Sequence, residues 1–367
     1  MEIKKIRLKN FRNYMDEEIF FSKNINLIFG ENAQGKTNII EALYLLATGK
    51  SHRTNNIKEM IRYGEKAFRI TLVFEDRGYE QKIEIRYEKD TGKELVVNEV
   101  KKEKMSEILG IVPSVLFAPE SLLSVKGSPG ERRKILDVVL CQINKRYLNN
   151  LQKYIRIIKN KNFLLKQIKI KRNAEEQLDI WNESQAITGA EIIKERRDII
   201  RNLEKRMNNI LCGISDGKEQ VKVNYKTVIE EEQQKVYEKM LEIIKQNKEK
   251  EIEQGICLYG PHRDDMEIYV NDKNSRVYCS QGQQRSVALA LNIGILEEIE
   301  EKIEKTPILL LDDVMSELDI KRQEYLYNFL DKRQTIITST EKSLLSNVNG
   351  MNISFIKIDN GKGYRMD

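Results

Sequence analysis

The segment at residues 30–37 constrains this chain more than any other. It reads Gly-Glu-Asn-Ala-Gln-Gly-Lys-Thr, follows the apolar run at residues 25–29 and precedes a helical pattern over residues 38–47. A glycine-rich loop between a strand and a helix lets backbone N–H groups and the helix N-terminus surround phosphate oxygens. Lys36 would then reach the β- and γ-phosphates, and Thr37 would give its hydroxyl to Mg²⁺. We expect ATP and Mg²⁺ to be held here by Gly30, Glu31, Asn32, Ala33, Gln34, Gly35, Lys36 and Thr37.

A second apolar run, at residues 308–311, ends in a pair of carboxylates, Asp312 and Asp313. Four apolar residues in a row predict a buried parallel strand, and ligands of such sheets bind at the carboxyl ends of the strands. We expect Asp312 to hold the Mg²⁺ shell through water, and Asp313 to orient or deprotonate the attacking water. An apolar strand that ends in Asp is common by itself, so this prediction depends on the phosphate loop.

Residues 280–285 read Ser-Gln-Gly-Gln-Gln-Arg and open a helical pattern. A hydroxyl and free N–H groups at a helix N-terminus form an anion site, so Ser280, Gly282 and Gln283 are candidate phosphate ligands. The simpler interpretation is that Ser280 only caps the helix. A second anion site in a chain that already has a phosphate loop favours ATP held from two sides.

Hydrophobic periodicity predicts an α/β fold with an inserted helical arm. Strand patterns cover residues 3–8 and two alternating runs joined at residues 76–78, which indicates an antiparallel β lobe. Residues 130–213 lack proline and show helical spacing, so we expect paired helices that turn near residues 172–173. Helices packed on the main domain are the alternative. One expected apolar face of this arm comprises Leu148, Leu151, Ile155, Ile158 and Leu165.

The rest of the chain completes this organisation. Residues 230–253 resemble one charged helix with a solvated face, and residues 359–361 a hairpin turn. Between them we expect strands, a helix over residues 287–303 and a strand over residues 335–338. The expected segments are 1–130, the first half of the head with its β lobe; 131–253, the helical arm; and 254–367, the second half of the head.

Composition excludes several classes of protein. No run of about 18 apolar residues exists among the 367, so we expect no membrane-spanning helix, and the N-terminal pattern differs from a signal peptide. The 4 cysteines show no CxxC pairing and only 2 histidines occur, which argues against a zinc or His-rich site and favours the cytoplasm. The net charge of +6 is too mild to establish a nucleic-acid partner.

Residues 145–172 contain ten Lys or Arg and no Asp or Glu. Such a segment would contact nucleic-acid phosphates without reading sequence, and no base-reading motif accompanies it. A lysine-rich solvated helix and a groove on top of an ATPase dimer are the two alternatives. The candidate DNA contacts are Lys153, Arg156, Lys159 and Lys161.

Taken together, these motifs resemble the ATP-binding-cassette ATPases that act on DNA, and among them the RecF family. The resemblance covers residues 9 to about 340 in the family's order. The stretches that carry it are residues 9–14, 48–53, 119–120, 125–129, 131–133, 259–265, 280–285, 312–313 and 316–319. The resemblance identifies residues 280–285 as the signature motif, Asp312 and Asp313 as the Walker B pair, and residues 316–319 as the D-loop.

The resemblance implies a head-to-tail homodimer driven by ATP, in which Ser280 and Gly282 of one subunit face the phosphate loop of the other. Lys36, Asp313 and Ser280 would be the catalytic residues, and Arg12 would touch a phosphate. Such proteins bind single-stranded, gapped or junction DNA, work with RecO and RecR, and help load the recombinase in recombinational repair, replication restart and the SOS response.

This chain departs from the wider cassette ATPases in two ways. Asp313 stands where a glutamate is usual, and Thr338 stands in the segment that usually carries a switch histidine. Both changes predict slow hydrolysis, since a misplacement of about 1 Å can lower a rate about 100-fold. With the resemblance, we expect a weak ATPase that DNA stimulates. The roles of His52 and of the motif at residues 262–264 stay open.

Two rival functions come from other classes. A transporter subunit predicts the switch histidine, which is missing here. A phage-defence ATPase coupled to a nuclease predicts a carboxylate-rich nuclease domain, and only about 50 residues follow the D-loop.

Overall fold

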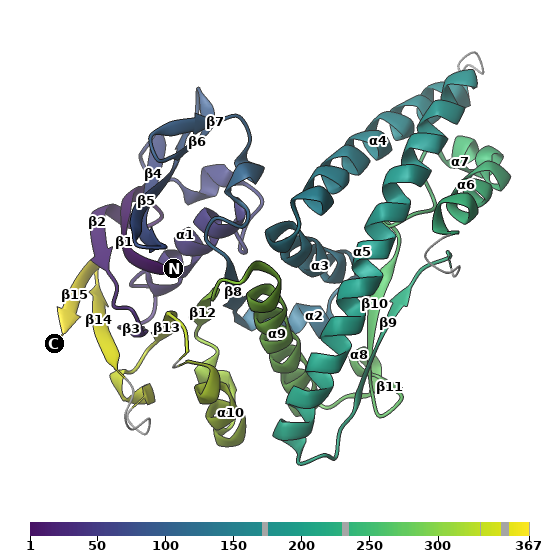
Figure 1. Cartoon of the computed structure of the whole chain (residues 1–367). Coiled ribbons are helices and arrows are strands. Elements are labelled where there is room, and N and C mark those ends of the chain that lie inside the picture. Colours follow the sequence, from purple (N-terminus) through teal and green to yellow (C-terminus); the bar gives the residue numbers. More distant parts are fainter. Residues whose placement is uncertain (171–174, 230–234, 331, 346–351, 367) are drawn as a thin grey trace. The chain divides into compact units, whose positions relative to one another are not determined.

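The computed structural model describes residues 1–170, 175–229, 235–330, 332–345 and 352–366. The chain divides into two compact units, and each is assembled from segments far apart in sequence (Figure 1). The first unit comprises Met1–Ser121, Gly213–Asp216 and Ala288–Asp367, and the second comprises Leu122–Cys212 and Gly217–Val287. Residues 254–287 therefore lie with the helical segments, whereas the sequence placed them in the second half of the head. The turn expected at residues 172–173 lies outside the described residues.

A six-stranded sheet forms the centre of the first unit, in the order β15-β14-β3-β13-β12-β8. All of its neighbours pair in parallel except β14 and β15, which form a hairpin. The central strands are buried, as expected of a parallel sheet covered on both faces. Its strands are β3 (Ile25–Phe29), β8 (Ser114–Phe117), β12 (Ile308–Asp312), β13 (Thr335–Ser339), β14 (Ile353–Asp359) and β15 (Lys362–Met366).

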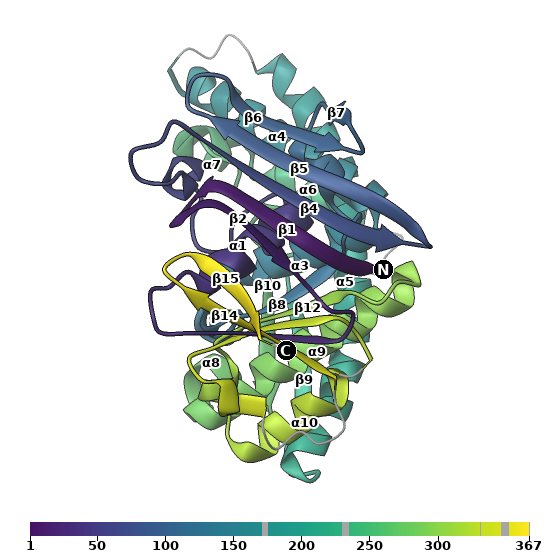
Figure 2. The same ribbon diagram turned by 90° about the vertical axis from the view of Figure 1, so that its left-hand side faces the viewer.

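A second six-stranded sheet of the first unit is antiparallel, in the order β2-β1-β4-β5-β6-β7. Figure 2 shows β1, β4, β5 and β6 side by side. Alternate residues such as Ile6, Leu8, Ile70 and Leu72 enter the core, and the residues between them face outward. Its strands are β1 (Glu2–Phe11), β2 (Tyr14–Phe20), β4 (Ala67–Asp76), β5 (Tyr79–Glu88), β6 (Gly92–Val97) and β7 (Val100–Lys102).

Helices complete the first unit. The longest one wholly inside it is α1, which packs against both sheets through Ile39, Ile40, Leu43 and Leu46. The described helices are α1 (Lys36–Thr48) and α10 (Ile320–Leu330), with short 3-10 turns η1 (Ile57–Met60), η2 (Met105–Ile108), η4 (Met315–Glu317) and η5 (Lys342–Leu345). Three of the described elements span the division between the units: η3 (Pro119–Leu122), the end of α5 (Glu176–Ser215) and α9 (Gln281–Ile303).

Long helices and a small sheet make up the second unit. Its sheet has the order β11-β10-β9, with strands β9 (Val221–Lys226), β10 (Asp265–Val270) and β11 (Lys273–Asn274). Its helices are α2 (Leu123–Lys126), α3 (Pro129–Ile143), α4 (Lys145–Ile170), α5 (Glu176–Ser215), α6 (Val236–Gln246), α7 (Lys248–Gln254) and α8 (Ser275–Tyr278). The single charged helix expected over residues 230–253 is thus two helices in its described part. None of the described helices combines the length and apolarity needed to cross a bilayer.

The apolar face of α4 differs from the expected one. Ile155 is 58% exposed, whereas Tyr154 and Ile157 are buried. The buried stripe continues through Lys161, Leu164 and Ile168 at helical spacing. Only Leu165 of the predicted face is fully enclosed.

Candidate functional site

The loop between β3 and α1 adopts a conformation that only small residues permit. Gly35 has φ +115°, and a Cβ there would lie 2.6 Å from Asn13 Nδ2. Gly30 has φ +153°, and a Cβ there would overlap the carbonyl oxygen of Ile358. The two glycines of the motif are therefore required by close backbone approach.

Neighbouring segments hold the loop in place. Asn13 Nδ2 donates to the carbonyl oxygen of Gln34 over 2.8 Å, and the Tyr14 hydroxyl donates to that of Gly35 over 3.1 Å. The backbone N–H of Asn360, in the turn between β14 and β15, donates to Gln34 Oε1 over 2.5 Å. Both sheets thus contribute to the shape of the phosphate loop.

Lys36 reaches back across this loop. Its Nζ donates to the carbonyl oxygens of Gly30 (2.7 Å) and Glu31 (2.8 Å). Burial lowers the pKa of Lys36, while attraction to Asp313 and Asp312 opposes that shift. The partly buried Lys36 ammonium, which donates to two neutral carbonyl oxygens, is suited to bind an anionic phosphate.

Asp312 lies at the carboxyl end of β12, as expected, and meets two hydroxyl groups. Its Oδ1 accepts from Thr37 Oγ1 over 3.0 Å and from Thr338 Oγ1 over 2.7 Å. Burial raises the pKa of Asp312, and the two hydroxyl donors favour the charged form. No group of three or more His, Cys, Asp or Glu is arranged for a metal ion within the described ranges. One carboxylate and one hydroxyl fit Mg²⁺, which takes its other ligands from water and phosphate.

Asp313 has a left-handed backbone, with φ +53°. Its N–H donates to Thr338 Oγ1 over 3.0 Å, and Ser316 Oγ donates to its carbonyl oxygen over 2.8 Å. A non-glycine residue held in this region by its neighbours is typical of functional sites. Thr338 therefore anchors the carboxylate of Asp312 and the backbone of Asp313, a role that the sequence did not reveal.

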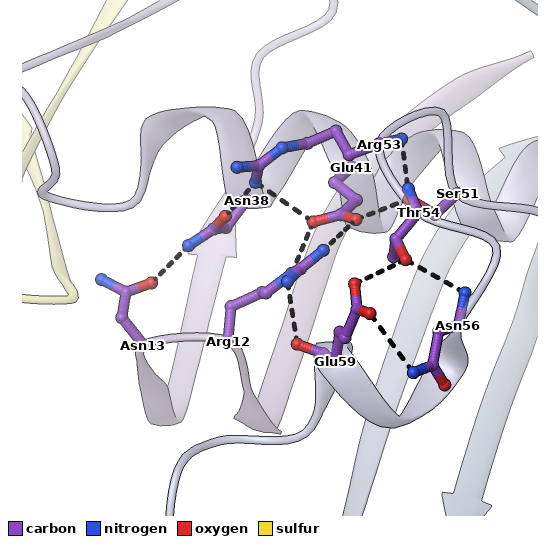
Figure 3. A network of polar contacts seen from close by, with 9 residues as sticks. All are labelled: Arg12, Asn13, Asn38, Glu41, Ser51, Arg53, Thr54, Asn56 and Glu59. Atoms are coloured by element: carbon purple, nitrogen blue, oxygen red, sulfur yellow. Dashed lines mark hydrogen bonds and ion pairs between the residues drawn. The ribbon is translucent and has the colours of Figure 1, made fainter.

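A fully buried carboxylate, Glu41, lies one helical turn after Thr37 and was not predicted. It accepts from Arg12 Nε (2.8 Å) and Nη2 (2.6 Å), from Ser51 Oγ (2.6 Å) and from Arg53 Nη1 (3.4 Å) (Figure 3). Arg12, predicted to meet a phosphate, is held in this network. The sequence feature that could have identified Glu41 is a charged residue on the apolar side of a predicted helix.

The network continues to the phosphate loop. Arg53 Nη1 donates to Asn38 Oδ1 over 2.8 Å, and Asn38 Nδ2 donates to Asn13 Oδ1 over 2.8 Å (Figure 3). Asn13 in turn holds Gln34. The polar chain thus connects Glu41 with the backbone of the loop.

In the second unit, Ser280 caps α9. Ser280 Oγ accepts from the N–H of Gln283 over 3.2 Å, and Gln283 Oε1 accepts from the N–H of Ser280 over 2.9 Å. This reciprocal pair is a capping box, so Ser280 caps the helix. Gln283 also donates to Glu219 over 2.9 Å. Phosphate binding by Ser280, Gly282 and Gln283 stays a prediction.

The basic helix α4 has two different faces. Lys153, Arg156 and Lys159 are exposed and remain candidates for DNA contact. The prediction for Lys161 is wrong, because its side chain is fully buried and its Nζ lies 2.7 Å from Glu251 Oε2 and 2.8 Å from Gln185 Oε1. It therefore joins α4 to α5 and α7.

The motif around His262 forms a polar cluster inside the second unit. His262 Nδ1 lies 2.7 Å from the Tyr154 hydroxyl, and its Nε2 lies 3.2 Å from the carbonyl oxygen of Cys257. Burial lowers the pKa of His262 to about 4. Asp265 pairs with Arg132 over 2.7 Å. These contacts give the motif a structural role.

Comparison with known proteins identifies the family of this chain. The family model described as RecF/RecN/SMC N terminal domain matches residues 2–362. A DNA replication and repair protein RecF from Acetivibrio thermocellus is 38% identical over 368 residues, which is 99% of this chain and 100% of that protein.

Solved structures give the same result. A recombination mediator protein RecF-ATP in the RecFOR pathway has a TM-score of 0.93 and 36% identity, with 100% of this chain and 98% of that chain covered. An Smc head domain from Pyrococcus furiosus, with 19% identity and a TM-score of 0.56 over 100% of this chain and 96% of that chain, shares the fold alone. The chain is a member of the RecF family, within the RecF/RecN/SMC group.

Proposed function

We propose that this protein is an ATP-switched DNA-binding ATPase of recombinational repair and replication restart. The observation that carries the proposal is the meeting of Thr37 and Asp312 at 3.0 Å beside the phosphate loop. These residues are 275 positions apart in sequence. Their convergence creates a hydroxyl and carboxylate pair where Mg²⁺ of a bound nucleotide is expected.

Each residue of the pair and the loop has a defined task. Lys36 exchanges its carbonyl partners for β- and γ-phosphate oxygens, and the N–H groups of residues 30–37 surround the phosphates. Mg²⁺, when bound, neutralises charge that develops on the phosphates. Thr37 and Asp312 hold it, and Asp313 orients the attacking water. The shorter side chain of Asp313 makes hydrolysis slow.

The site would be completed by a second copy of the chain. The N-terminus of α9, with the Ser280 and Gly282 backbone, offers an anion site of the kind that a γ-phosphate fits. In a head-to-tail homodimer each nucleotide would lie between the phosphate loop of one subunit and this helix end of its partner. ATP then stabilises the dimer by binding it in preference to the monomer, and hydrolysis releases it.

DNA is the proposed partner of the exposed face of α4. Lys153, Arg156 and Lys159 present three cations within two helical turns. Contacts of this type bind phosphates without sequence preference. The family resemblance also supports our proposals of gapped or single-stranded DNA, of RecO and RecR as partners, of stimulation by DNA and of a cytoplasmic location.

The test is the mass of the protein in solution, with and without ATP, Mg²⁺ and gapped duplex DNA. We expect a nucleotide-dependent dimer for the wild type and for Lys66→Ala, an exposed matched control. Lys36→Ala should stay monomeric under all conditions. A wild type that remains monomeric with ATP, Mg²⁺ and DNA would contradict the proposed sandwich.

A further inference from the structure

His52 has two ring nitrogens that no group satisfies. Both are buried, and neither has a hydrogen-bond partner among the residues that the structure describes. The ring stacks edge-on against Tyr44 of α1, with centroids 5.6 Å apart and an angle of 89°. The other histidine, His262, has partners at both nitrogens.

An unsatisfied imidazole of this kind requires an explanation. Burial lowers the pKa of His52, and nearby carboxylates do not reverse the shift, so the ring is neutral near pH 7. A neutral imidazole carries one N–H donor and one acceptor. A buried donor or acceptor without a partner is unfavourable, and native proteins keep few of them.

The position of the ring indicates what its partner is. Asp312, Glu41 and Glu120 act on His52 electrostatically, and Asp312 and Glu120 also act on each other. Asp312 is the acidic residue of the candidate Mg²⁺ site. Thr37, Glu41 and Tyr44 lie at helical spacing on one face of α1, where Ser51 contacts Glu41 and the His52 ring contacts Tyr44. The ring therefore lies along the face of α1 that carries Thr37.

The backbone on either side of His52 is fixed. Ser51 Oγ donates to Glu41 over 2.6 Å and accepts from the N–H of Arg53 over 3.0 Å. Arg53 also pairs with Glu41. The segment that carries the ring is thus anchored to Glu41 on both sides of His52.

We propose that His52 is a positioning residue whose ring hydrogen-bonds to the bound Mg²⁺–nucleotide, through a phosphate oxygen or a water of the metal shell. This inference depends on the proposed function of the loop. Such a hydrogen bond forms only when the nucleotide is bound. Its contribution therefore belongs to nucleotide affinity and to the rate of hydrolysis, not to folding.

The test uses His52→Phe, which keeps a ring against Tyr44 and removes both polar atoms. Without nucleotide, thermal unfolding should be unchanged or shifted upward. With Mg²⁺–ATP, we expect about tenfold weaker binding and a smaller rise in melting temperature. His52→Asn and His52→Gln place an amide near one nitrogen each, and one of them should recover part of the affinity.

Three controls separate the outcomes. If the wild type itself gains no stability from Mg²⁺–ATP, and Lys36→Ala behaves identically, the proposed function fails first. If the wild type binds Mg²⁺–ATP and His52→Phe binds and hydrolyses it equally well, only the inference about His52 is overturned. A His52→Phe protein that loses stability without nucleotide, with no recovery of binding in either amide variant, would also overturn it.

Discussion

Two threonine hydroxyls, one from helix α1 and one from strand β13, meet one carboxylate oxygen at the candidate Mg²⁺ site. Thr37 and Thr338 both donate to Asp312 Oδ1, and Thr338 also accepts from the N–H of Asp313. Burial alone would favour the protonated form of Asp312, because it raises the pKa of this carboxyl. The hydroxyls oppose that effect and keep a negative charge available for the metal ion.

Thr338→Val should weaken the site without removing a ligand. The loss of a hydrogen bond to the charged Asp312 raises its pKa further and leaves Asp313 without its backbone anchor. We expect the Mg²⁺ concentration for half-maximal hydrolysis to rise about tenfold. Thr335→Val is the matched control, since Thr335 is buried in the same strand and its hydroxyl contacts only backbone carbonyls at 3.4–3.5 Å. Equal Mg²⁺ titrations of the two variants would contradict this role.

The buried imidazole of His262 predicts a dependence of stability on pH. Its pKa of about 4 lies below the ordinary value of 6.5, so the unfolded chain binds this proton first as pH falls. The contribution of neutral His262 to the free energy of unfolding is fully present above pH 6.5. It is lost as the pH falls from about 6.5 to about 4, and it amounts to at most about 3 kcal/mol.

The raised pKa of Asp264 acts in the opposite direction, because the folded protein then takes up protons more readily. The measurement is therefore a difference between the wild type and His262→Gln, by denaturant unfolding at several pH values. The advantage of the wild type should shrink on acidification through this window. Parallel curves would show that His262 does not titrate as the contacts indicate.

At the scale of elements, α4 shows what a count of charges can miss. Lys161 lies four residues after Ile157 and three before Leu164, both of which are enclosed. Helical spacing therefore places Lys161 in the apolar stripe, and this signal was present in the sequence. Its partner Glu251 on α7 was not visible, because the ion pair depends on how three helices pack.

Lys161→Ala and Lys159→Ala should differ in their effect on the free energy of unfolding. Removal of Lys161 leaves Glu251 buried without a counter-charge, which costs about 3–5 kcal/mol of unfolding free energy. Lys159 is exposed, so its removal should change stability by less than about 0.5 kcal/mol.

The DNA affinity of the two variants supplies the second half of this test. Lys159→Ala should weaken binding and lower the slope of log affinity against log salt by about 0.9 on duplex DNA. Lys245→Ala, an exposed lysine on α6, is the control. An unchanged slope for Lys159→Ala would move the DNA site away from α4.

Local motifs were predictable because their geometry is contained within a few residues. The strand, loop and helix around Lys36 agree with the sequence pattern, and so does the hairpin turn at residues 359–361. Contacts of Asp312 with Thr338, or of Gln34 with Asn360, depend on the order of strands in the sheet. No periodicity within one segment reports that order, so these partners required the structure.

At the scale of the whole molecule, the proposed dimer predicts complementation. Each composite site would use Lys36 of one subunit and Ser280 of the other. A dimer of Lys36→Ala with Ser280→Arg then carries both defects in one site and none in the other. The mixture should recover activity that neither variant shows alone, because only the mixed dimer contains an intact composite site. Each variant alone should be inactive, and a mixture without recovery would contradict the head-to-tail arrangement.

The contact between the phosphate loop and the hairpin turn also bears on how the protein is made. Gln34 and Asn360 meet although they are 326 residues apart, and β14 pairs directly with β3. A ribosome that adds 5–20 residues per second needs roughly 15–65 s to cover that distance. During this interval β3 lacks its partner strand β14 and is accessible to chaperones. Competence for nucleotide is therefore acquired late in synthesis.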